Sequence, residues 1–234
     1  MAKRQNQSST ALFDISKLLT VKPLTENQQK TFDYFNENYN LILSGNAGTG
    51  KTFLALYLAL KSFLLRKYER VVIIRSIVPT RNIGFLKGTQ AEKECVYEDV
   101  YRSIFSELLP TIPNAYDTMK KEKTVEFKST SFIRGITIKN SIVIVDEFQN
   151  LSRHELSSVI TRIGENSRLL LVGDYYQSDF RYEDEKSGVL LFLKILANMP
   201  DDFKRVDFQI SDVVRSGLCK RFLLAEHELR QHSD

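Results

Sequence analysis

Residues 45–52 have types and spacing that suit them to bind a phosphate group. They match the pattern G-x-x-x-x-G-K-[ST], whose glycines let successive backbone N–H groups point inward as a nest for an anion. The Lys51 ammonium can reach the β- and γ-phosphates of a nucleotide, and the Thr52 hydroxyl can ligate Mg²⁺. We therefore predict a nucleotide-binding loop formed by Gly45, Asn46, Ala47, Gly48, Thr49, Gly50, Lys51, Thr52 and Phe53.

The segments on either side of this loop are those that the motif requires. Residues 41–43 are an apolar run typical of a buried strand, and from Lys51 to about Arg66 apolar residues recur at helical spacing. The positive end of that helix's dipole would add to the attraction for a phosphate. A glycine-rich turn that binds nothing is the alternative, and the full match in this context argues against it.

A pair of acids gives the second strong signal. Residues 142–145 are four consecutive β-branched residues, which predicts a strand covered on both faces, as in a parallel sheet. Asp146 and Glu147 follow it directly. In a phosphate-loop protein the first acid organises Mg²⁺ and the second can activate the attacking water. We therefore predict that Thr52 and Asp146 form the metal site and that Glu147 is the general base.

Two glutamines are weaker candidates. Thr25 and Gln28 form a helix-capping pattern, and the Gln28 amide could also pair with the edge of an adenine. Gln177 follows a predicted strand at 168–172 and could sense the γ-phosphate. A simple cap and a simple turn remain open as the alternative readings.

Basic residues Arg75, Arg81 and Lys87 lie in a loop after a short predicted strand at 71–74. The carboxyl ends of strands are where open α/β sheets place their ligands, so these side chains could bind phosphates. A solvated basic loop is an equally good reading of the same residues.

The other elements alternate between strand and helix, which predicts a doubly wound, mainly parallel α/β sheet. A helix over 91–109 carries an apolar stripe of Val96, Val100, Ile104 and Leu108, which Tyr97 and Tyr101 widen, and we expect this stripe to pack in the core. Further expected elements are strands at 125–128, at the sheet edge, and at 203–208, and helices at 152–164 and 187–198. The expected cap of the final helix is Ser211-Asp212.

Length and composition fit one ordinary globular domain. The 234 residues are 42% hydrophobic and 26% charged, and we expect a disordered tail at 1–18 and a single domain at 19–234. A net charge of +4 permits nucleic-acid binding without requiring it. The two cysteines have no metal-site spacing, and no apolar run approaches the roughly 20 residues of a membrane helix. We expect a protein of a reducing compartment, the cytoplasm.

The order of these motifs resembles the PhoH-like family of ATPases, whose domain looks like the first RecA-like half of a superfamily-one helicase. The resemblance covers about residues 20–225 and is most specific at 83–88, at Arg134-Gly135 and at 146–150. The sequence departs from the family at four positions, namely Ser76, Lys87, Phe148 and Ser216. The short length looks like a compact phage version.

The resemblance implies a RecA-like P-loop NTPase with ATP and Mg²⁺ as cofactors and RNA or single-stranded DNA as partner. It implies that Gln28 reads adenine, that Gln177 senses the γ-phosphate and that Arg215 contacts it. Arg75, Arg81, Lys87 and Arg134 would lie towards the nucleic acid. Because a helicase closes two such domains over ATP and this chain has length for one, the resemblance implies self-assembly into a ring, such as a hexamer. We expect the protein in the cytoplasm of a bacterial or phage-infected host cell.

Two other functions remain to be weighed. A nucleotide-dependent switch or assembly module would bind ATP with little turnover. A small-molecule kinase would need an acceptor site and a lid, and the adjacent acids favour water as the acceptor. Turnover that nucleic acid stimulates would separate the ATPase from the switch.

Overall fold

The computed structural model describes residues 12–76, 90–133, 135–175, 183–214 and 217–231. Its strands are β1 (Asn40–Gly45), β2 (Arg70–Arg75), β3 (Val125–Ser129), β4 (Ser141–Asp146), β5 (Arg168–Gly173) and β6 (Phe203–Phe208). The helices are α2 (Glu26–Asn36), α3 (Lys51–Leu64), α4 (Gln90–Leu108), α5 (Ala115–Lys121), α6 (Arg153–Ile160), α7 (Glu183–Ala197) and α8 (Gly217–Gln231). Short 3-10 turns are η1 (Ile15–Lys17), η2 (Thr130–Phe132), η3 (Phe148–Asn150) and η5 (Ile210–Asp212).

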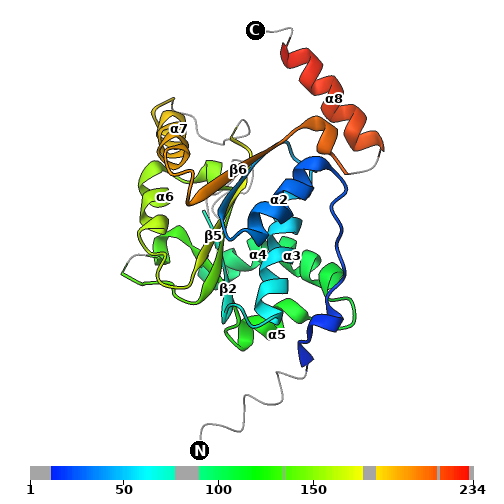
Figure 1. Cartoon of the computed structure of the whole chain (residues 1–234), viewed down its shortest axis with the longest axis vertical. Coiled ribbons are helices and arrows are strands. Elements are labelled where there is room, and N and C mark those ends of the chain that lie inside the picture. Colours follow the sequence, from blue (N-terminus) through cyan, green and yellow to red (C-terminus); the bar gives the residue numbers. More distant parts are fainter. Residues whose placement is uncertain (1–11, 77–89, 134, 176–182, 215–216, 232–234) are drawn as a thin grey trace, which may run out of the picture.

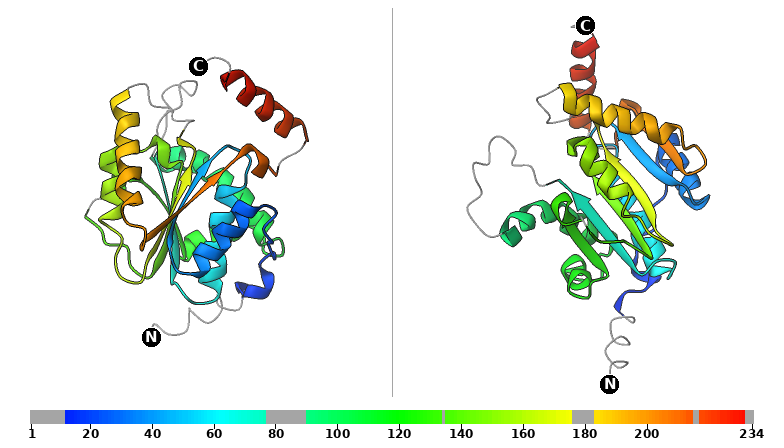
Figure 2. Two further views of the ribbon diagram at one scale, coloured as in Figure 1. Left: turned by 45° about the horizontal axis from the view of Figure 1, so that its top comes forward. Right: turned by 90° about the vertical axis from the view of Figure 1, so that its left-hand side faces the viewer.

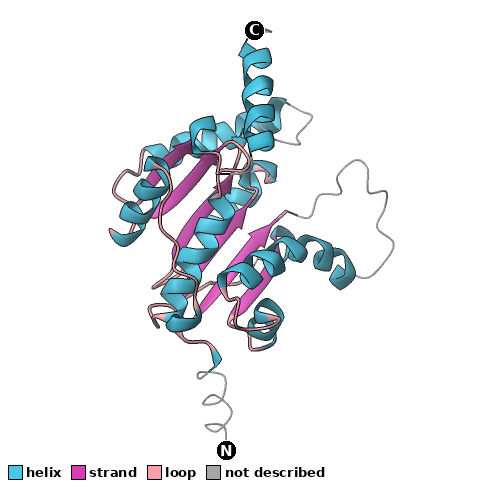
Figure 3. Cartoon of the chain, turned by 90° about the vertical axis from the view of Figure 1, so that its right-hand side faces the viewer, coloured by secondary structure: helices cyan, strands magenta, loops and turns pink. Residues whose placement is uncertain are grey.

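The strands form one sheet in the order β3-β2-β4-β5-β1-β6, and every pairing is parallel (Figure 3). The predicted edge position of β3 is confirmed. All the strands therefore end at the same edge of the sheet. The loop after β1 and the acids at the end of β4 meet there, with the end of β5 between them.

Helices cover both faces of the sheet, which confirms the predicted doubly wound α/β fold. In Figure 1, α2, α3, α4 and α5 lie on one side of the sheet and α6 and α7 on the other. Residues of β4 alternate between the two cores: Ile142 and Ile144 pack with the first group of helices, and Val143 and Val145 with the second. This explains why the strand is apolar at every position.

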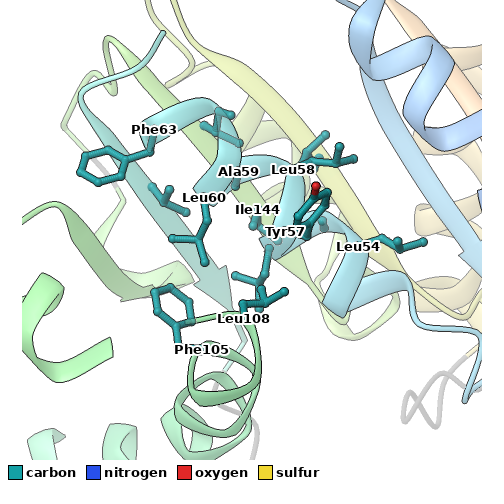
Figure 4. Close-up of a cluster of buried hydrophobic side chains, with 14 of the residues drawn as sticks. Leu54, Tyr57, Leu58, Ala59, Leu60, Phe63, Phe105, Leu108 and Ile144 are labelled. Carbon is teal, nitrogen blue, oxygen red and sulfur yellow. The ribbon is translucent and has the colours of Figure 1, made fainter. Parts of the chain in front are cut away.

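Helix α3 is the centre of the larger core. Eleven of its 14 residues are buried, because α2, α4 and the sheet enclose it. Figure 4 shows Leu60 and Phe63 of α3 near Phe105 and Leu108 of α4, with Ile144 of β4 behind. The first residues of α3 are Lys51 and Thr52, so this packing fixes where their side chains begin.

Helix α8 stands apart from the layered body (Figure 2) and packs against η5. Its Leu218 and Phe222 side chains are exposed. None of the described helices combines the length and the apolarity that crossing a bilayer requires.

Three predictions about elements were wrong. The stripe on α4 is confirmed at Leu108 and Tyr101, which are buried, but Val96 and Val100 are exposed and Phe105 is completely buried, because aromatic rings fill the space beside α5 and β3. The helix predicted to reach residue 164 ends at Ile160. Asp212 caps no long helix. It closes a capping box on η5 and accepts a hydrogen bond from Asn27.

Residues before the expected domain boundary at residue 19 also pack on the domain. Phe13 and Leu18 are buried in the larger core, and Asp14 caps η1. Residues 1–11 lie outside the described part of the chain. Helix α5 is not among the predicted elements.

We predict that any side chain at residue 45 would destabilise the fold, even without a ligand. A Cβ at this residue would lie 2.0 Å from the Phe208 carbonyl oxygen, a backbone atom of β6, and the φ of Gly45 is +126°. Gly45→Ala should therefore lower the free energy of unfolding by about 3 kcal/mol or more, measured by urea denaturation.

Gly135→Ala is the matched control, because Gly135 also has a positive φ (+82°) but nothing lies within 4 Å of its added Cβ. That variant should lose about 1 kcal/mol from backbone strain alone. Equal losses in the two variants would contradict the close approach of β1 to β6.

Candidate functional site

The predicted phosphate-binding loop turns directly from β1 into α3. Gly48 and Gly50 both have a positive φ, which lets the backbone curl at these points. The Thr49 hydroxyl donates a hydrogen bond to the Asn46 carbonyl at 2.9 Å, and the Val214 N–H donates to the Gly48 carbonyl at 3.2 Å. The loop is thus held from within and from the segment after β6.

Lys51 folds over this loop. Its Nζ lies 2.5 Å from the Gly45 carbonyl oxygen and 2.6 Å from that of Asn46. Burial lowers the pKa of the ammonium, while the charges of Asp174, Glu147 and Asp146 act in the opposite direction. The ammonium is therefore a largely dehydrated cation facing three carboxylates, where an anion's oxygens could replace the carbonyls as its partners.

Asp146 is held by groups from three different elements. Thr52 Oγ1 donates to Asp146 Oδ1 at 3.0 Å, and Tyr101 OH of α4 donates to Oδ2 at 2.8 Å. Arg75 Nη1, at the end of β2, lies 3.7 Å from Oδ2. Thr52 and Asp146, predicted to share a metal ion, are thus in direct contact.

The pKa of Asp146 is raised, first by burial and then by the neighbouring Glu147, although Arg75, Tyr101 and Thr52 act in the opposite direction. The opposing causes matter because Asp146 is only 2% exposed. Without these donors a carboxylate at this depth would favour its neutral form. The three partners therefore favour the charged form and fix its orientation.

Glu147 sits in a left-handed backbone conformation, with φ 53° and ψ 45°, at the sharp turn from β4 into η3. Gln149 Nε2 donates to Glu147 Oε2 at 2.5 Å, and Gln149 Oε1 accepts the Asp174 N–H at 3.0 Å. A Cβ on Gly173 would lie 2.1 Å from Gln149 Oε1. Gln149 thus links Glu147 to the end of β5. The Gln149 amide fits there because residue 173 is a glycine and has no side chain.

Gln28 is buried against the phosphate-binding loop, with 3% of its surface exposed. Its Oε1 accepts the Leu24 N–H at 2.8 Å, and its Nε2 donates to the Thr49 carbonyl at 3.2 Å. The predicted cap is also present, because the Thr25 hydroxyl accepts the Gln28 N–H. One amide hydrogen and one lone pair of the Gln28 side chain are left for another partner.

Several predicted site residues cannot be placed. Gln177, Arg215, Arg81, Lys87 and Arg134 lie outside the described residues. Of the predicted nucleic-acid contacts, only Arg75 is described, and it lies at Asp146, with its guanidinium 5.5 Å from the centre of the Tyr97 ring. Ala47 is exposed at the loop, and Phe53 packs at the edge of the larger core.

Sequence reasoning missed Tyr101, Gln149 and Asn27. The sequence predicts Tyr101 only as core packing and Gln149 only as part of the motif at 146–150. Asn27 Nδ2 donates to Asp212 Oδ2 at 2.8 Å, which ties α2 to η5 beside the loop. Each contact joins residues far apart in the chain or separated by a turn, and no spacing in the sequence signals them.

The oxygen atoms of Thr52 and Asp146 suit Mg²⁺, which prefers hydroxyl, carboxylate, water and phosphate oxygens. Within the described ranges no group of three or more His, Cys, Asp and Glu residues could hold a metal ion. A site with few protein ligands fits Mg²⁺, because this ion keeps several waters and binds phosphates as well.

Solved structures with a similar arrangement include the Sulfolobus solfataricus SWI2/SNF2 ATPase core in complex with dsDNA, at 12% identity and a TM-score of 0.46. The match covers 84% of this chain and 46% of that one. The large terminase from a thermophilic bacteriophage, in complex with ADP, matches at 12% identity and a TM-score of 0.43, over 84% of this chain and 48% of that one.

Curated relatives are more similar in sequence. A PhoH-like protein of Mycobacterium leprae is 29% identical over 97% of this chain and 65% of its own length. A PhoH-like protein of Synechocystis is 34% identical over 77% of this chain and 54% of its own length. The protein PhoH of Escherichia coli is 28% identical over 79% and 52%. The chain thus spans between about half and two thirds of the length of these relatives.

The family model for PhoH-like proteins matches residues 20–226, which includes the loop, both acids and Gln28. The range that the family model matches agrees with the range of about 20–225 over which the sequence motifs resemble this family. The parallel sheet, the loop after β1 and the acids ending β4 are the RecA-like P-loop NTPase arrangement that this resemblance implied. The chain therefore belongs to the PhoH-like family.

Proposed function

We propose that this protein is a Mg²⁺-dependent ATPase that converts ATP to ADP and phosphate. The observation that carries the proposal is the 3.0 Å contact between the Thr52 hydroxyl and the Asp146 carboxylate. It joins the phosphate-binding loop to the acidic end of β4 across the intervening strand β5. Glu147 follows Asp146 directly, so a cation-binding group, a phosphate-binding loop and a candidate base lie together at one edge of the sheet.

Each side chain has a distinct part in this reaction. The loop N–H groups and Lys51 bind the phosphates, and the ammonium offsets negative charge as it develops. Thr52 and Asp146 would hold Mg²⁺, which when bound supplies further positive charge to the phosphate oxygens. Glu147 orients the attacking water and accepts its proton, and Gln149 holds one carboxylate oxygen so that the other can face the water.

Further assignments extend this proposal to the rest of the nucleotide. Gln28 would use its remaining amide hydrogen and lone pair to read adenine, which its position against Thr49 supports. Arg215 follows Val214, whose N–H binds the loop at Gly48, and would contact the γ-phosphate. Gln177 would sense the same phosphate from beyond the end of β5.

We also propose RNA or single-stranded DNA as the partner, in the cytoplasm of a bacterial or phage-infected cell, with Arg75, Arg81, Lys87 and Arg134 towards it. The family resemblance and the net positive charge support this. A neighbouring subunit would supply the second wall of the nucleotide site, as in a hexameric ring.

A nucleotide-dependent switch is the second candidate, because Gln28 and Val214 connect the loop to segments that are distant in the sequence. Such a protein would bind ATP and change partners with little turnover. Steady hydrolysis that rises on addition of RNA or single-stranded DNA would favour the ATPase. Tight ATP binding without turnover would favour the switch.

Glu147→Gln should bind ATP with nearly wild-type affinity but lose at least about a hundredfold in turnover, because the amide cannot accept the proton of the water. Phosphate release and the dissociation constant of ATP are measured on the same sample. Glu165→Gln is the control, since Glu165 is exposed and pairs with the Lys139 side chain at the surface. Unchanged hydrolysis in Glu147→Gln would remove Glu147 from this role.

Tyr101→Phe should raise the Mg²⁺ concentration needed for half-maximal activity by about tenfold, because a hydrogen bond to a charged group contributes roughly 1.5 kcal/mol. The ring stays, so packing is preserved. Tyr116→Phe is the matched control: its buried hydroxyl donates to Glu98 at 2.6 Å, away from Asp146. An equal shift of the Mg²⁺ requirement in both variants would show that Tyr101 is merely structural.

Self-assembly is tested by light scattering with ATP and Mg²⁺ present. We expect a mass several times the 27.0 kDa of one chain, since the proposed ring completes the nucleotide site between subunits. Active protein that remains strictly monomeric would contradict the shared site.

A further inference from the structure

A cavity of about 280 Å³ lies outside the nucleotide site. Its walls come from η2 and from the first turns of α6, and every lining residue is polar. The lining residues are Thr130, Ser131, His154, Glu155 and Ser158.

The cavity is on the same edge of the sheet as the proposed ATP site. The turn η2 follows the carboxyl end of β3, and α6 begins a few residues after the carboxyl end of β4. Strands β3 and β4 are separated by β2 alone, so their ends are roughly 10 Å apart. A ligand in the cavity would therefore lie beside the acids without occupying their pocket.

The chemistry of the walls suits a neutral or anionic ligand that accepts hydrogen bonds. Ser131, Ser158 and His154 present hydroxyl and imidazole groups. Glu155 does not present a bare carboxylate, because Oε1 accepts the Thr130 hydroxyl at 2.5 Å and Oε2 accepts the Ser152 N–H and hydroxyl, each at 2.8 Å. Through these hydrogen bonds the Glu155 carboxylate joins η2 to α6, which makes the cavity walls rigid.

Phe132 follows the lining residue Ser131 directly in the chain, and 57% of its surface is exposed. The exposure of the Phe132 side chain does not come from an unanchored segment. Thr130, two residues earlier, is buried and bonded to Glu155, and Ile133 directly after it is completely buried in the smaller core. The backbone therefore holds an aromatic ring at the surface in a fixed place.

We propose that Phe132 and this cavity form a binding subsite for single-stranded nucleic acid. A base stacks on the Phe132 ring, and the adjoining sugar and phosphate accept hydrogen bonds from Ser131, His154 and Ser158. Stacking platforms beside polar groups are how proteins bind single strands without reading sequence. The inference rests on the proposed nucleic-acid partner and names where on the chain one nucleotide is bound.

The test is fluorescence anisotropy with labelled oligouridylate and oligothymidylate, in the full chain and at one fixed salt concentration. Phe132→Ala should weaken binding by about 5- to 150-fold, the usual effect of removing one stacking platform. Phe132→Trp should bind at least as tightly as wild type, because the larger ring also stacks. His154→Ala should weaken binding less than Phe132→Ala.

Phe222→Ala is the matched control, because Phe222 is exposed to a similar extent, at 65%, and belongs to α8, which lies far from α6 in Figure 1. It should leave the affinity unchanged. Thermal unfolding of each variant shows that the fold is retained, and the wide exposure of Phe132 makes a large loss of stability unexpected.

The proposal is overturned if Phe132→Ala binds both oligonucleotides as wild type does, if Phe222→Ala loses as much affinity, or if the wild-type chain binds neither. Hydrolysis of ATP by the wild-type chain is measured separately. A chain that binds oligonucleotides through Phe132 but hydrolyses no ATP would refute the ATPase and support the subsite.

Discussion

The contact between Thr52 and Asp146 is the interaction on which the rest of the site depends. Thr52 is fixed by the burial of α3, and Asp146 is fixed at the end of the fully buried strand β4. Strand β5 lies between β1 and β4, so the two residues meet only because all three strands are parallel and end together. The large core of the molecule thus determines the position of a few polar atoms at one edge of its sheet.

Burying a carboxylate at that edge is unfavourable unless donors surround it. Asp146 receives them from α3, α4 and β2, and the Lys51 ammonium lies nearby as a countercharge. Glu147 is treated differently. It is turned out of the strand by its left-handed backbone and restrained through Gln149 by one hydrogen bond. Two adjacent acids therefore have separate environments, one closed and fixed and the other oriented but open, as separate chemical roles require.

Much of this arrangement could be predicted from sequence, because the loop motif and the apolar strands are local signals. The strand at 203–208 and the parallel sheet are examples. The buried face of α4 could be predicted only in part, since Phe105 is selected by the shape of the space beside α5 rather than by the apolar period, which wrongly placed Val96 and Val100 inside. Gln149 and Asn27 were missed because their partners lie on other elements. Asp212 was read as a local cap, whereas its contact with Asn27 spans nearly the whole chain.

The most direct test of the account is the effect of Mg²⁺ on nucleotide binding in Asp146→Asn, measured by isothermal titration with ADP. The amide has the shape of the carboxylate but lacks its charge. If Asp146 and the loop share one pocket, Mg²⁺ should strengthen binding to the wild-type chain and have little effect on the variant, while binding without Mg²⁺ stays nearly equal. A variant that keeps the full Mg²⁺ effect would contradict the shared site.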